Sequence, residues 1–308
     1  MKWGLFFILA VAVALVSACV PRKLVVREMA DMVETGLPAF EQDDDLEMVQ
    51  RAFPANIKLL EALLVNDPEN VALLVLLSRL YAGYTFGFAE GDLEAALFAA
   101  EPAETENDRV RLLKDRVNRY YLKGADYALK ALEQHHPGCR IRLNTVTAID
   151  SFLASLTIDD VPPLFWYGFH LGAFVNRNFD SIKTIATAHV AEKAMQRVVE
   201  LDPAYYHGGA HLFLLTYYAS RAPMLGGDLD AARSHYEKLK QVTGKGYLLA
   251  DVYYARFVLY QQQRRGAYEK MLKRVIRQTD LPIKYRMVNA VARKRAGLYL
   301  GAAERLFE

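Results

Sequence analysis

The chain has 308 residues, of which 53% are hydrophobic, and it carries a formal net charge of +2 at pH 7. This length is sufficient for one large or two modest domains with a substantial buried core. The near balance of charge excludes the broad basic surface that recruits nucleic acid, so we expect no nucleic-acid partner. With only two cysteines, Cys19 and Cys139, stability must come from packing rather than from a disulfide framework.

The N-terminus has the three parts of a bacterial secretory signal. Lys2 provides a positive start, residues 5–16 form a short apolar run, and two small residues precede a cleavage site. The next residue is Cys19, so the segment resembles the lipobox of bacterial lipoproteins. This resemblance implies that residues 1–18 are a signal peptide, that the Cys19 thiol receives a diacylglyceryl group, and that Cys19 becomes the first mature residue.

The alternative for this segment is a single membrane-spanning anchor. Residues 5–16 are too few for it, because a helix needs roughly 20 apolar residues to cross a bilayer. Two or more acyl chains, by contrast, hold a protein stably at a membrane. No aspartate directly follows Cys19, and in many Gram-negative lipoproteins that absence goes with the outer membrane. We therefore expect a periplasmic protein that is lipid-anchored to the inner leaflet of the outer membrane.

Residues 19–45 are predicted to form a lipidated tether with a short helix. Pro21, Gly36 and Pro38 interrupt this segment, an acidic run follows, and apolar periodicity is weak. From residue 46 onward apolar residues recur every three or four positions, as one face of a helix requires. No comparable alternation with a period of two occurs. We therefore predict that residues 46–308 form an all-α domain.

Two signals recur with nearly the same spacing, which indicates an internal repeat. Asp67-Pro68 and Asp202-Pro203 are 135 residues apart, and each pair suits a helix N-cap followed by proline in the first turn. Gly91-Asp92-Leu93 and Gly227-Asp228-Leu229 are 136 residues apart. This shift is about four units of 34 residues, as in a tetratricopeptide array, although an ordinary gene duplication gives the same spacing.

The tetratricopeptide pattern itself is only partly present. Ala232, Tyr236 and Leu239 have the spacing of the small and large residues of its second helix, and a similar spacing runs from Ala191 to Pro203. The pattern of the first helix is missing. We interpret the chain as a degenerate tetratricopeptide-like array, an α–α superhelix in which each unit buries its apolar stripe against its neighbours.

Helix positions follow from the same periodicity and from the placement of glycine and proline. Gly226-Gly227 and Gly244-Lys245-Gly246 are predicted to be turns between helices, because a phosphate loop needs a longer glycine pattern. The helices predicted after residue 65 cover residues 71–84, 108–135, 141–156, 163–176, 180–200, 205–218, 230–243, 247–263, 266–278 and 282–300.

Few residues suggest chemistry. His207 and His211 lie four apart and would share a helix face, but two histidines leave a zinc site short of ligands. The fragment with His135, His136 and Cys139 contains Pro-Gly and is better interpreted as a loop. No Gly-x-Ser-x-Gly motif is present. We therefore predict no metal site, no cofactor and no enzymatic activity.

Aromatic residues gather in clusters on several predicted helices. Most are expected in the core, because large side chains fill the space between helices. Adjacent aromatic pairs cannot all point inward, however, so one member of each pair is expected to face a groove or cavity. From this chemistry we select Trp166, Tyr205, His211 and Tyr217 as candidates for a groove that binds a ligand or a partner.

Short segments in the middle of the chain carry a family resemblance. They are Trp166-Tyr167, residues 191–194, 201–205 and 208–211, and residues 222–228, whose Pro-x-x-Gly-Gly-Asp pattern is the most specific. Together they resemble the T-component of tripartite ATP-independent periplasmic (TRAP) transporters. Members of that family are periplasmic lipoproteins with cryptic tetratricopeptide repeats, and the resemblance covers roughly residues 46–280.

The resemblance implies a homotrimer that docks the periplasmic solute-binding protein of the transporter, with a hydrophobic channel through each subunit. Only Cys19 transfers as a specific site. We therefore expect an accessory of a solute uptake system that guides a hydrophobic or amphipathic organic acid. A tetratricopeptide scaffold lipoprotein for outer-membrane or envelope assembly is the alternative, and a periplasmic enzyme is a third interpretation.

Overall fold

The computed structural model describes residues 22–100, 107–178, 184 and 187–308. Every regular element within these ranges is a helix, which confirms the predicted all-α fold. Cys19 and the predicted signal peptide lie outside the described residues, and so does most of the stretch 179–186. The tetratricopeptide-like geometry of the array stays a prediction.

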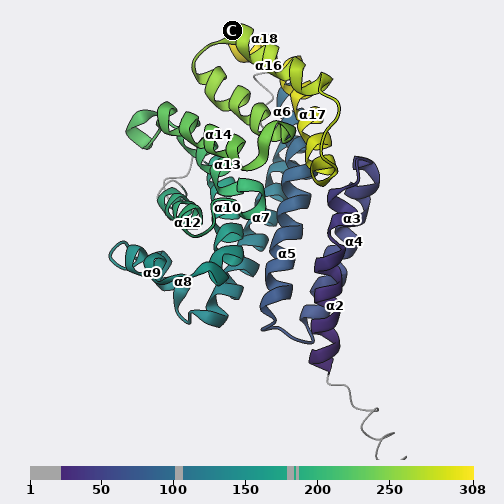
Figure 1. The fold of residues 1–308 in the computed structure, drawn as a ribbon, viewed down its shortest axis with the longest axis vertical. Coiled ribbons are helices and arrows are strands. Elements are labelled where there is room, and N and C mark those ends of the chain that lie inside the picture. The colour runs from purple at the N-terminus through teal and green to yellow at the C-terminus, as the bar shows by residue number, and fades with distance from the viewer. Residues whose placement is uncertain (1–21, 101–106, 179–183, 185–186) are drawn as a thin grey trace, which may run out of the picture.

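The first helices extend from one side of the molecule, where α2 lies, to its middle, where α7 lies (Figure 1). The elements are α2 (Arg22–Gly36), α3 (Pro38–Glu41), α4 (Leu46–Leu64), α5 (Val71–Tyr84), the π-helix η1 (Thr85–Ala89), α6 (Glu90–Ala99) and α7 (Asp108–His135). α5, η1 and α6 follow one another without a turn. They therefore act as one long helical segment.

The rest of the chain contributes shorter helices. The middle elements are α8 (Cys139–Leu143), α9 (Ile149–Ser155), η3 (Ile158–Asp160), α10 (Val161–Arg177), α12 (Ala188–Leu201), α13 (Tyr205–Ala219), η4 (Pro223–Leu225) and α14 (Leu229–Thr243). The C-terminal elements are η5 (Gly244–Gly246), α15 (Leu248–Tyr253), the π-helix η6 (Tyr254–Leu259), α16 (Arg265–Arg277), η7 (Ile283–Tyr285), α17 (Arg286–Gly301) and α18 (Ala303–Phe307).

Neighbouring helices pack in series and then close on themselves. α5 contacts α7, α7 contacts α10, α10 contacts α12 and α13, and α13 contacts α14 and α15. α17 contacts α15 and returns to α3, α4 and η1, so the last helices lie beside the first ones (Figure 1). A ring of helices from η1 through α7, α10, α13, α15 and α17 thus surrounds an interior space.

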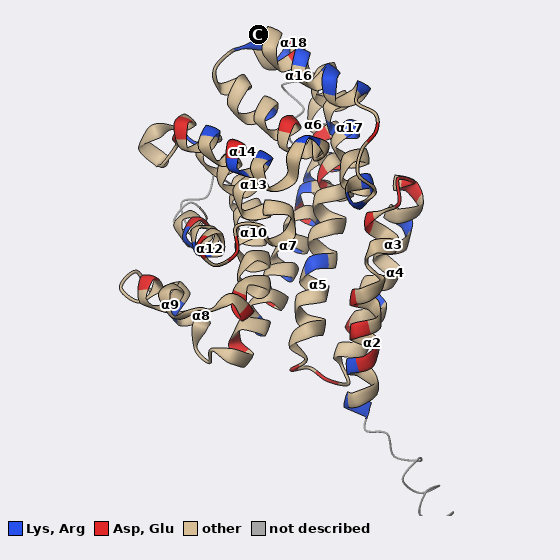
Figure 2. Cartoon of the chain, viewed as in Figure 1, with Lys and Arg blue, Asp and Glu red and all other residues tan. Residues whose placement is uncertain are grey.

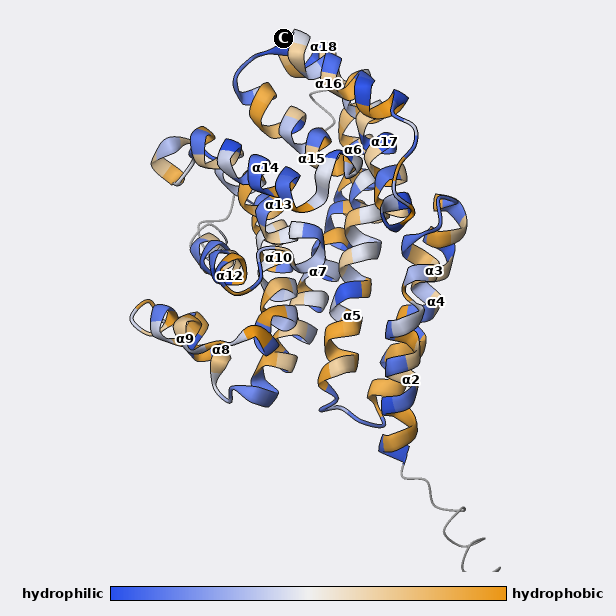
Figure 3. Cartoon of the chain, in the orientation of Figure 1, coloured by the Kyte–Doolittle hydropathy of each residue, from blue (hydrophilic) through white to orange (hydrophobic). Residues whose placement is uncertain are grey.

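The segment Val71–Ala99 is long and apolar enough, by length and composition, to cross a membrane. In its most apolar window, however, 61% of the residues are buried inside the protein. Leu73, Leu74 and Leu77 have no exposed surface. Figure 3 shows the hydrophobic residues of α5 among neighbouring helices. The packing of α2, α4 and α7 around it accounts for its apolar composition.

The segment predicted as a tether is largely helical where it is described. α2 packs on α5 and buries Val26 and Ala30, which are 4% and 1% exposed. Lys23 Nζ and Arg27 Nε each lie 3.5 Å from the buried carboxylate of Asp67. Only these two residues of α2 are buried, and a helix that buries so few residues needs only a weak apolar pattern in its sequence. The acidic run that follows forms the turn between α3 and α4 (Figure 2).

The prediction that Asp67 and Asp202 are helix N-caps is wrong. α5 begins three residues later than Pro68, and its N-cap is Asn70, whose Oδ1 accepts from Leu73 N at 3.0 Å. Asp202 lies before α13, and its Oδ1 accepts from Ala204 N at 3.0 Å. Each aspartate therefore stabilises the turn that leads into the helix, because its carboxylate bonds within that turn.

Most predicted helices are present. Those at 71–84, 108–135, 163–176, 230–243 and 266–278 end within two residues of their predicted positions. The predicted helix 141–156 is wrong, because α8 ends at Leu143 and α9 begins at Ile149. Asn144 Nδ2 and Thr145 Oγ1 donate to main-chain carbonyls of α8, both at 2.8 Å. Such bonds compete with continuation of a helix.

The remaining predicted helices differ in form. Of the predicted helix 247–263, residues 248–261 are helical and residues 262–263 form a turn, and the second half is the π-helix η6 rather than an α-helix. The predicted helix 282–300 begins as the short helix η7 before α17 starts at Arg286. Of the predicted helix 180–200, the part that the structure describes as regular helix is α12, from Ala188 onward.

Candidate functional site

A cavity of about 390 Å³ lies inside the ring of helices. Its walls come from α5, η1, α6, α7, α10, α13, α15, η6 and α17. One part of the wall, which we call the aromatic part, consists of Phe165, Trp166, Phe169 and Tyr206. Another part, which we call the charged part, consists of Glu90, Glu94, Arg177 and Arg256 in the cavity wall and of Arg295, which lies behind the two carboxylates.

Both π-helices lie in the cavity wall. η1 contributes Phe86 and Gly87, and η6 contributes Arg256 and Phe257. A π-helix inserts residues into an α-helix and turns side chains in directions that the regular helix would not allow, and it often occurs at functional sites. The two segments therefore aim an aromatic ring and a guanidinium group into the same space.

The start of α13 has a backbone conformation that the sequence does not predict. Tyr206, His207 and Gly208 have φ values of 44°, 60° and 70°, so three consecutive residues are left-handed. This conformation costs about 1–2 kcal/mol for each residue with a side chain. It brings the ring of Tyr206 to 4.7 Å from that of Trp166 in the cavity wall.

α13 approaches α10 closely because it carries glycine at position 209. A Cβ on Gly209 would lie 2.6 Å from Cζ of Phe165, which is too close for any real contact. The absence of a side chain thus allows the ring of Phe165 to lie against the main chain of α13. Both positions belong to the cavity wall.

The left-handed turn also separates His207 from His211. The expectation that they share a helix face is wrong, because the residues between them do not continue a right-handed helix back to His207. His207 packs on Tyr285 at 5.1 Å. His211 instead meets His235 of α14, with 2.9 Å between the two Nδ1 atoms. Burial, and then the charge on His211, lower the pKa of His235 to about 4.

The charged part is held together by hydrogen bonds around Glu90. This carboxylate is 4% exposed and accepts from Arg177, from Arg295 Nη2 at 2.7 Å and from Tyr121 Oη at 3.0 Å. Glu94 accepts from Tyr299 Oη at 3.1 Å. Arg295, on α17, also lies 3.7 Å from Glu94. The network therefore ties α6 to α7, α10 and α17.

The two arginines of this network differ in their electrostatic surroundings. Burial and the positive charge of Arg295 lower the pKa of Arg177 to about 10, so its guanidinium stays protonated at neutral pH. Burial also disfavours the charged form of Arg295. The nearby Tyr253 and Glu94 favour the charged form, however, and the pKa of Arg295 is raised above its ordinary value. The surroundings of Arg295 thus stabilise its positive charge, whereas those of Arg177 stabilise its charge less.

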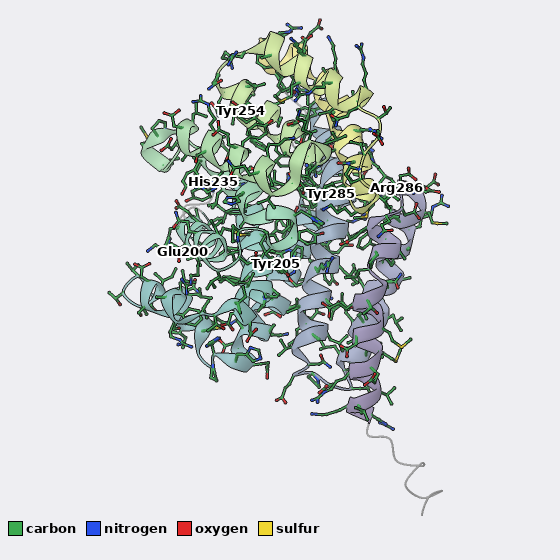
Figure 4. The ribbon with its side chains drawn as sticks, viewed as in Figure 1. Glu200, Tyr205, His235, Tyr254, Tyr285 and Arg286 are labelled. Atoms are coloured by element: carbon green, nitrogen blue, oxygen red, sulfur yellow. The ribbon has the colours of Figure 1, made fainter. Side chains whose placement is uncertain are left out.

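The four candidate groove residues lie at different places. Trp166 is 1% exposed and lies in the cavity wall. Tyr205 packs on Phe165 at 5.2 Å from outside that wall, and Figure 4 shows it in the middle of the array. His211 faces α14, and Tyr217 lies beneath Arg221, 3.5 Å from its guanidinium carbon. Whether any of the four contacts a ligand or a partner stays a prediction.

Sequence reasoning missed the charged part. Arg295 lies on the predicted helix 282–300 between Val291 and Tyr299, four residues to either side, which are both buried. A charged residue on an otherwise apolar helix face is the one signal that pointed to it. Nothing in the sequence connects it to Glu90, which lies 205 residues away. No group of three or more His, Cys, Asp and Glu able to hold a metal occurs in the described ranges.

Comparison with known proteins identifies a family and a relative. A family model described as TRAP transporter T-component matches residues 42–307. An uncharacterized protein of Treponema pallidum (strain Nichols) is 26% identical over 240 residues, which cover 77% of this chain and 72% of that protein. The residues matched by the family model include every helix that encloses the cavity.

Proposed function

This chain belongs to the family of TRAP transporter T-components, and we propose that it docks the solute-binding protein of such a transporter and guides an organic solute through its cavity. The family is a transporter component and not an enzyme family. A TRAP transporter component has a periplasmic or membrane-associated location. The proposal adds to this role a partner and a path for the solute.

The cavity is the observation that carries the proposal. Protein interiors are normally packed with few voids larger than a water molecule. Here about 390 Å³ stays open among aromatic side chains, which is within the range of sites for small organic ligands. Two π-helices and a left-handed turn shape its wall, although each is less favourable than regular helix. These features support a space that is maintained for an occupant.

The proposed anchor is consistent with this role. Lipidation of Cys19 would attach the chain three residues before α2, which packs on α5. The helical array would then stand close to the inner leaflet of the outer membrane, in the compartment where solute-binding proteins diffuse. Assembly as a homotrimer would present three cavities at one place. Both features are parts of the proposal.

Copurification tests the docking step. The native lipoprotein is isolated from cells that express the transporter, and the complex is analysed by native mass spectrometry. We expect the solute-binding protein to be retained, with three copies of the lipoprotein. Retention of envelope-assembly proteins without any solute-binding protein would replace the proposal with the scaffold function. Retention of neither would contradict both.

A further inference from the structure

Three segments lie toward the end of the molecule from which the chain leads to Cys19 (Figure 1). The first turns of α2 contact the α4–α5 turn, because Lys23 and Arg27 both lie near Asp67. The C-terminal half of α7, which leads into α8, belongs with α2 and α5 to one buried apolar cluster that includes Ala131. We call these segments the anchor-side end, and they comprise residues 22–27, 65–70 and 139–148.

We propose that the anchor-side end rests on the surface of the lipid bilayer, with Val65, Ile141 and Val146 inserted among the lipid headgroups. This inference rests on the part of the proposed function that anchors the chain through Cys19. It adds a second contact with the membrane, which the folded body makes. That contact fixes the orientation of the helical array relative to the bilayer.

The tether limits how far the anchor-side end can leave the bilayer. Arg22, the first residue of α2, follows Cys19 by three positions. An extended chain spans at most about 3.5 Å per residue, so Arg22 stays within about 10 Å of an acylated Cys19. The other two segments are connected to α2 through packed helices. They are therefore held close to the lipid headgroups as well.

Charge changes sign along the first helices, and the basic end is the one beside the tether. Residues 22–27 carry three basic residues and no acidic one, whereas residues 28–47 carry eight acidic residues and no basic one. Figure 2 shows the basic residues at the start of α2 and acidic ones beside α3. The whole anchor-side end carries five basic and two acidic residues. Lipid phosphates attract such a surface and repel the acidic one.

Exposed aliphatic side chains occur at the same end. Val65, Ile141 and Val146 are 78%, 73% and 79% exposed. Among the described residues, Met224 is the one large hydrophobic side chain that is more exposed than Val65 and Val146. Each of the three lies in a turn or a short helix, where no neighbouring helix covers it. An aliphatic side chain gains free energy when it leaves water, and the headgroup region accepts apolar groups to a depth of about 5–10 Å.

The neighbours of Ile141 suit a position at the membrane surface. Arg140 and Arg142 flank it in the sequence. Arg140 Nη2 donates to Asp126 Oδ1 at 3.0 Å, and the guanidinium carbon of Arg142 lies 4.3 Å from the centre of the Phe152 ring. Long basic side chains keep their charge at the level of the headgroups while an apolar neighbour reaches deeper. The Arg-Ile-Arg segment has this arrangement.

A lipid surface fits these side chains better than a second copy of this chain. A stable protein–protein interface buries roughly 1,200 Å² or more, with complementary shapes. Here the exposed side chains are few and come from two separate segments. A bilayer adapts to any spacing, and an anchored surface meets it at an effective concentration on the order of millimolar, so weak contacts become occupied.

Quenching by brominated lipids measures the contact. The acylated protein is reconstituted in vesicles of phosphatidylethanolamine and phosphatidylglycerol, with bromine on the acyl chains in one of two sets. Ile141→Trp places a reporter at the anchor-side end, and the emission of Trp166, measured on the parent protein, is subtracted. We expect bromine to lower the emission of the Ile141→Trp reporter about twofold or more, because the side chain reaches the acyl boundary.

Met224→Trp is the matched control for this reporter. Met224 is 91% exposed but lies between α13 and α14, farther from the start of α2 (Figure 1). We expect bromine to leave its emission nearly unchanged. Tryptophan itself favours the membrane interface, so a second measurement uses Val146→Trp as reporter and removes a neighbouring aliphatic group. Ile141→Ser is expected to weaken its quenching severalfold, whereas Ile283→Ser, 56% exposed in η7, is expected to have no effect.

Three results would overturn the inference. The first is equal quenching of the Ile141→Trp and Met224→Trp reporters. The second is the absence of an acyl group on Cys19 by intact-mass measurement. The third is loss of the oligomer in Ile141→Ser while the quenching of the Val146→Trp reporter is unchanged, which would assign this surface to a second copy of the chain.

Docking is measured separately on the same variant. Capture of the solute-binding protein by Ile141→Ser is expected to be unchanged, because the variant alters only the contact with lipid. Circular dichroism shows whether each variant is folded. Failure of the membrane contact is therefore distinguishable from failure of the proposed docking function.

Discussion

The two halves of the predicted repeat carry the same signals but fold differently. In the first half, Gly91-Asp92-Leu93 lies within the unbroken segment Val71–Ala99. In the second half, Gly227-Asp228-Leu229 lies at the turn between α13 and α14. An identical tripeptide therefore continues a helix in one place and separates two helices in the other.

The residue before the tripeptide accounts for the difference. Gly226 has φ of 85°, a left-handed conformation that ends the short helix η4. The equivalent residue in the first half is Glu90, which is helical and bonded to Arg177 and Arg295. The hydrogen bonds of Glu90 to α10 and α17 thus favour a continuous helix in the first half. Gly226 has no side chain and adopts the left-handed conformation that ends the helix in the second half. Three matched pairs of positions test this comparison.

The largest effect is expected at the first pair. Glu90→Gln removes the charge that two buried arginines share, and we expect the free energy of unfolding to fall by about 3–5 kcal/mol. Gly226→Ala forces a side chain into the left-handed region and is expected to cost about 1–2 kcal/mol. Urea-induced unfolding followed by circular dichroism measures both. A smaller loss for Glu90→Gln than for Gly226→Ala would contradict the role of the charged network.

The second pair is expected to respond in opposite directions. A Cβ on Gly227 would overlap the carbonyl of Arg221, so Gly227→Ala must distort the turn, at a cost of about 3 kcal/mol. Nothing lies within 4 Å of a Cβ on Gly91, so Gly91→Ala is expected to stabilise the helix by about 0.5–1 kcal/mol. The same unfolding measurement applies. Destabilisation of similar size by both changes would show that the two glycines are equivalent after all.

The packing of the first half is expected to depend on pH through His170. This residue lies on α10, and its Nε2 is 2.9 Å from the carbonyl oxygen of Ser78 on α5. Burial lowers the pKa of His170 from 6.5 to about 4, so the folded state holds it neutral. Between these values the unfolded chain binds a proton that the folded chain excludes, and the free energy of unfolding therefore falls as pH drops from 6.5 to 4.

Unfolding experiments at several pH values measure this contribution. We expect a loss on the order of 2 kcal/mol between pH 7 and pH 4 that involves His170. His170→Gln is expected to be less stable at pH 7 but to have a flatter pH dependence. His135→Gln is the control, because His135 is half exposed at 48%. An unchanged slope in His170→Gln would refute the assignment.

The smallest effect is expected at the third pair. Asp228 is the N-cap of α14, and its Oδ1 accepts from Asp230 N and Ala231 N, both at 2.9 Å. Asp228→Ala is expected to cost about 1 kcal/mol. Asp92 is exposed inside a continuing helix, so Asp92→Ala is expected to change stability by less than about 0.5 kcal/mol. Equal losses at the two positions would mean that Asp92 also caps a helix.

The sequence alone predicted a helix well where its own amphipathic pattern defines the helix. The helix at 108–135 is amphipathic along its whole length, and α7 covers the same residues. The left-handed turn at Tyr206 and the π-helix η6 were not predicted, because their residues show ordinary apolar periodicity. Their geometry comes from contacts with other helices rather than from their own sequence.

The same distinction applies to the site. Aromatic clusters in the sequence nominated Trp166, Tyr205, His211 and Tyr217 for a groove that binds a ligand or a partner, and that role stays a prediction. Trp166 lines the cavity and the other three do not. The charged part remained hidden because Glu90, Arg177 and Arg295 come from three distant helices. The sequence by itself determined the all-α class, most of the helix positions and the family, since periodicity and short motifs are local. Only the tertiary structure decided which charges meet inside the cavity, because electrostatic pairing depends on distance in space.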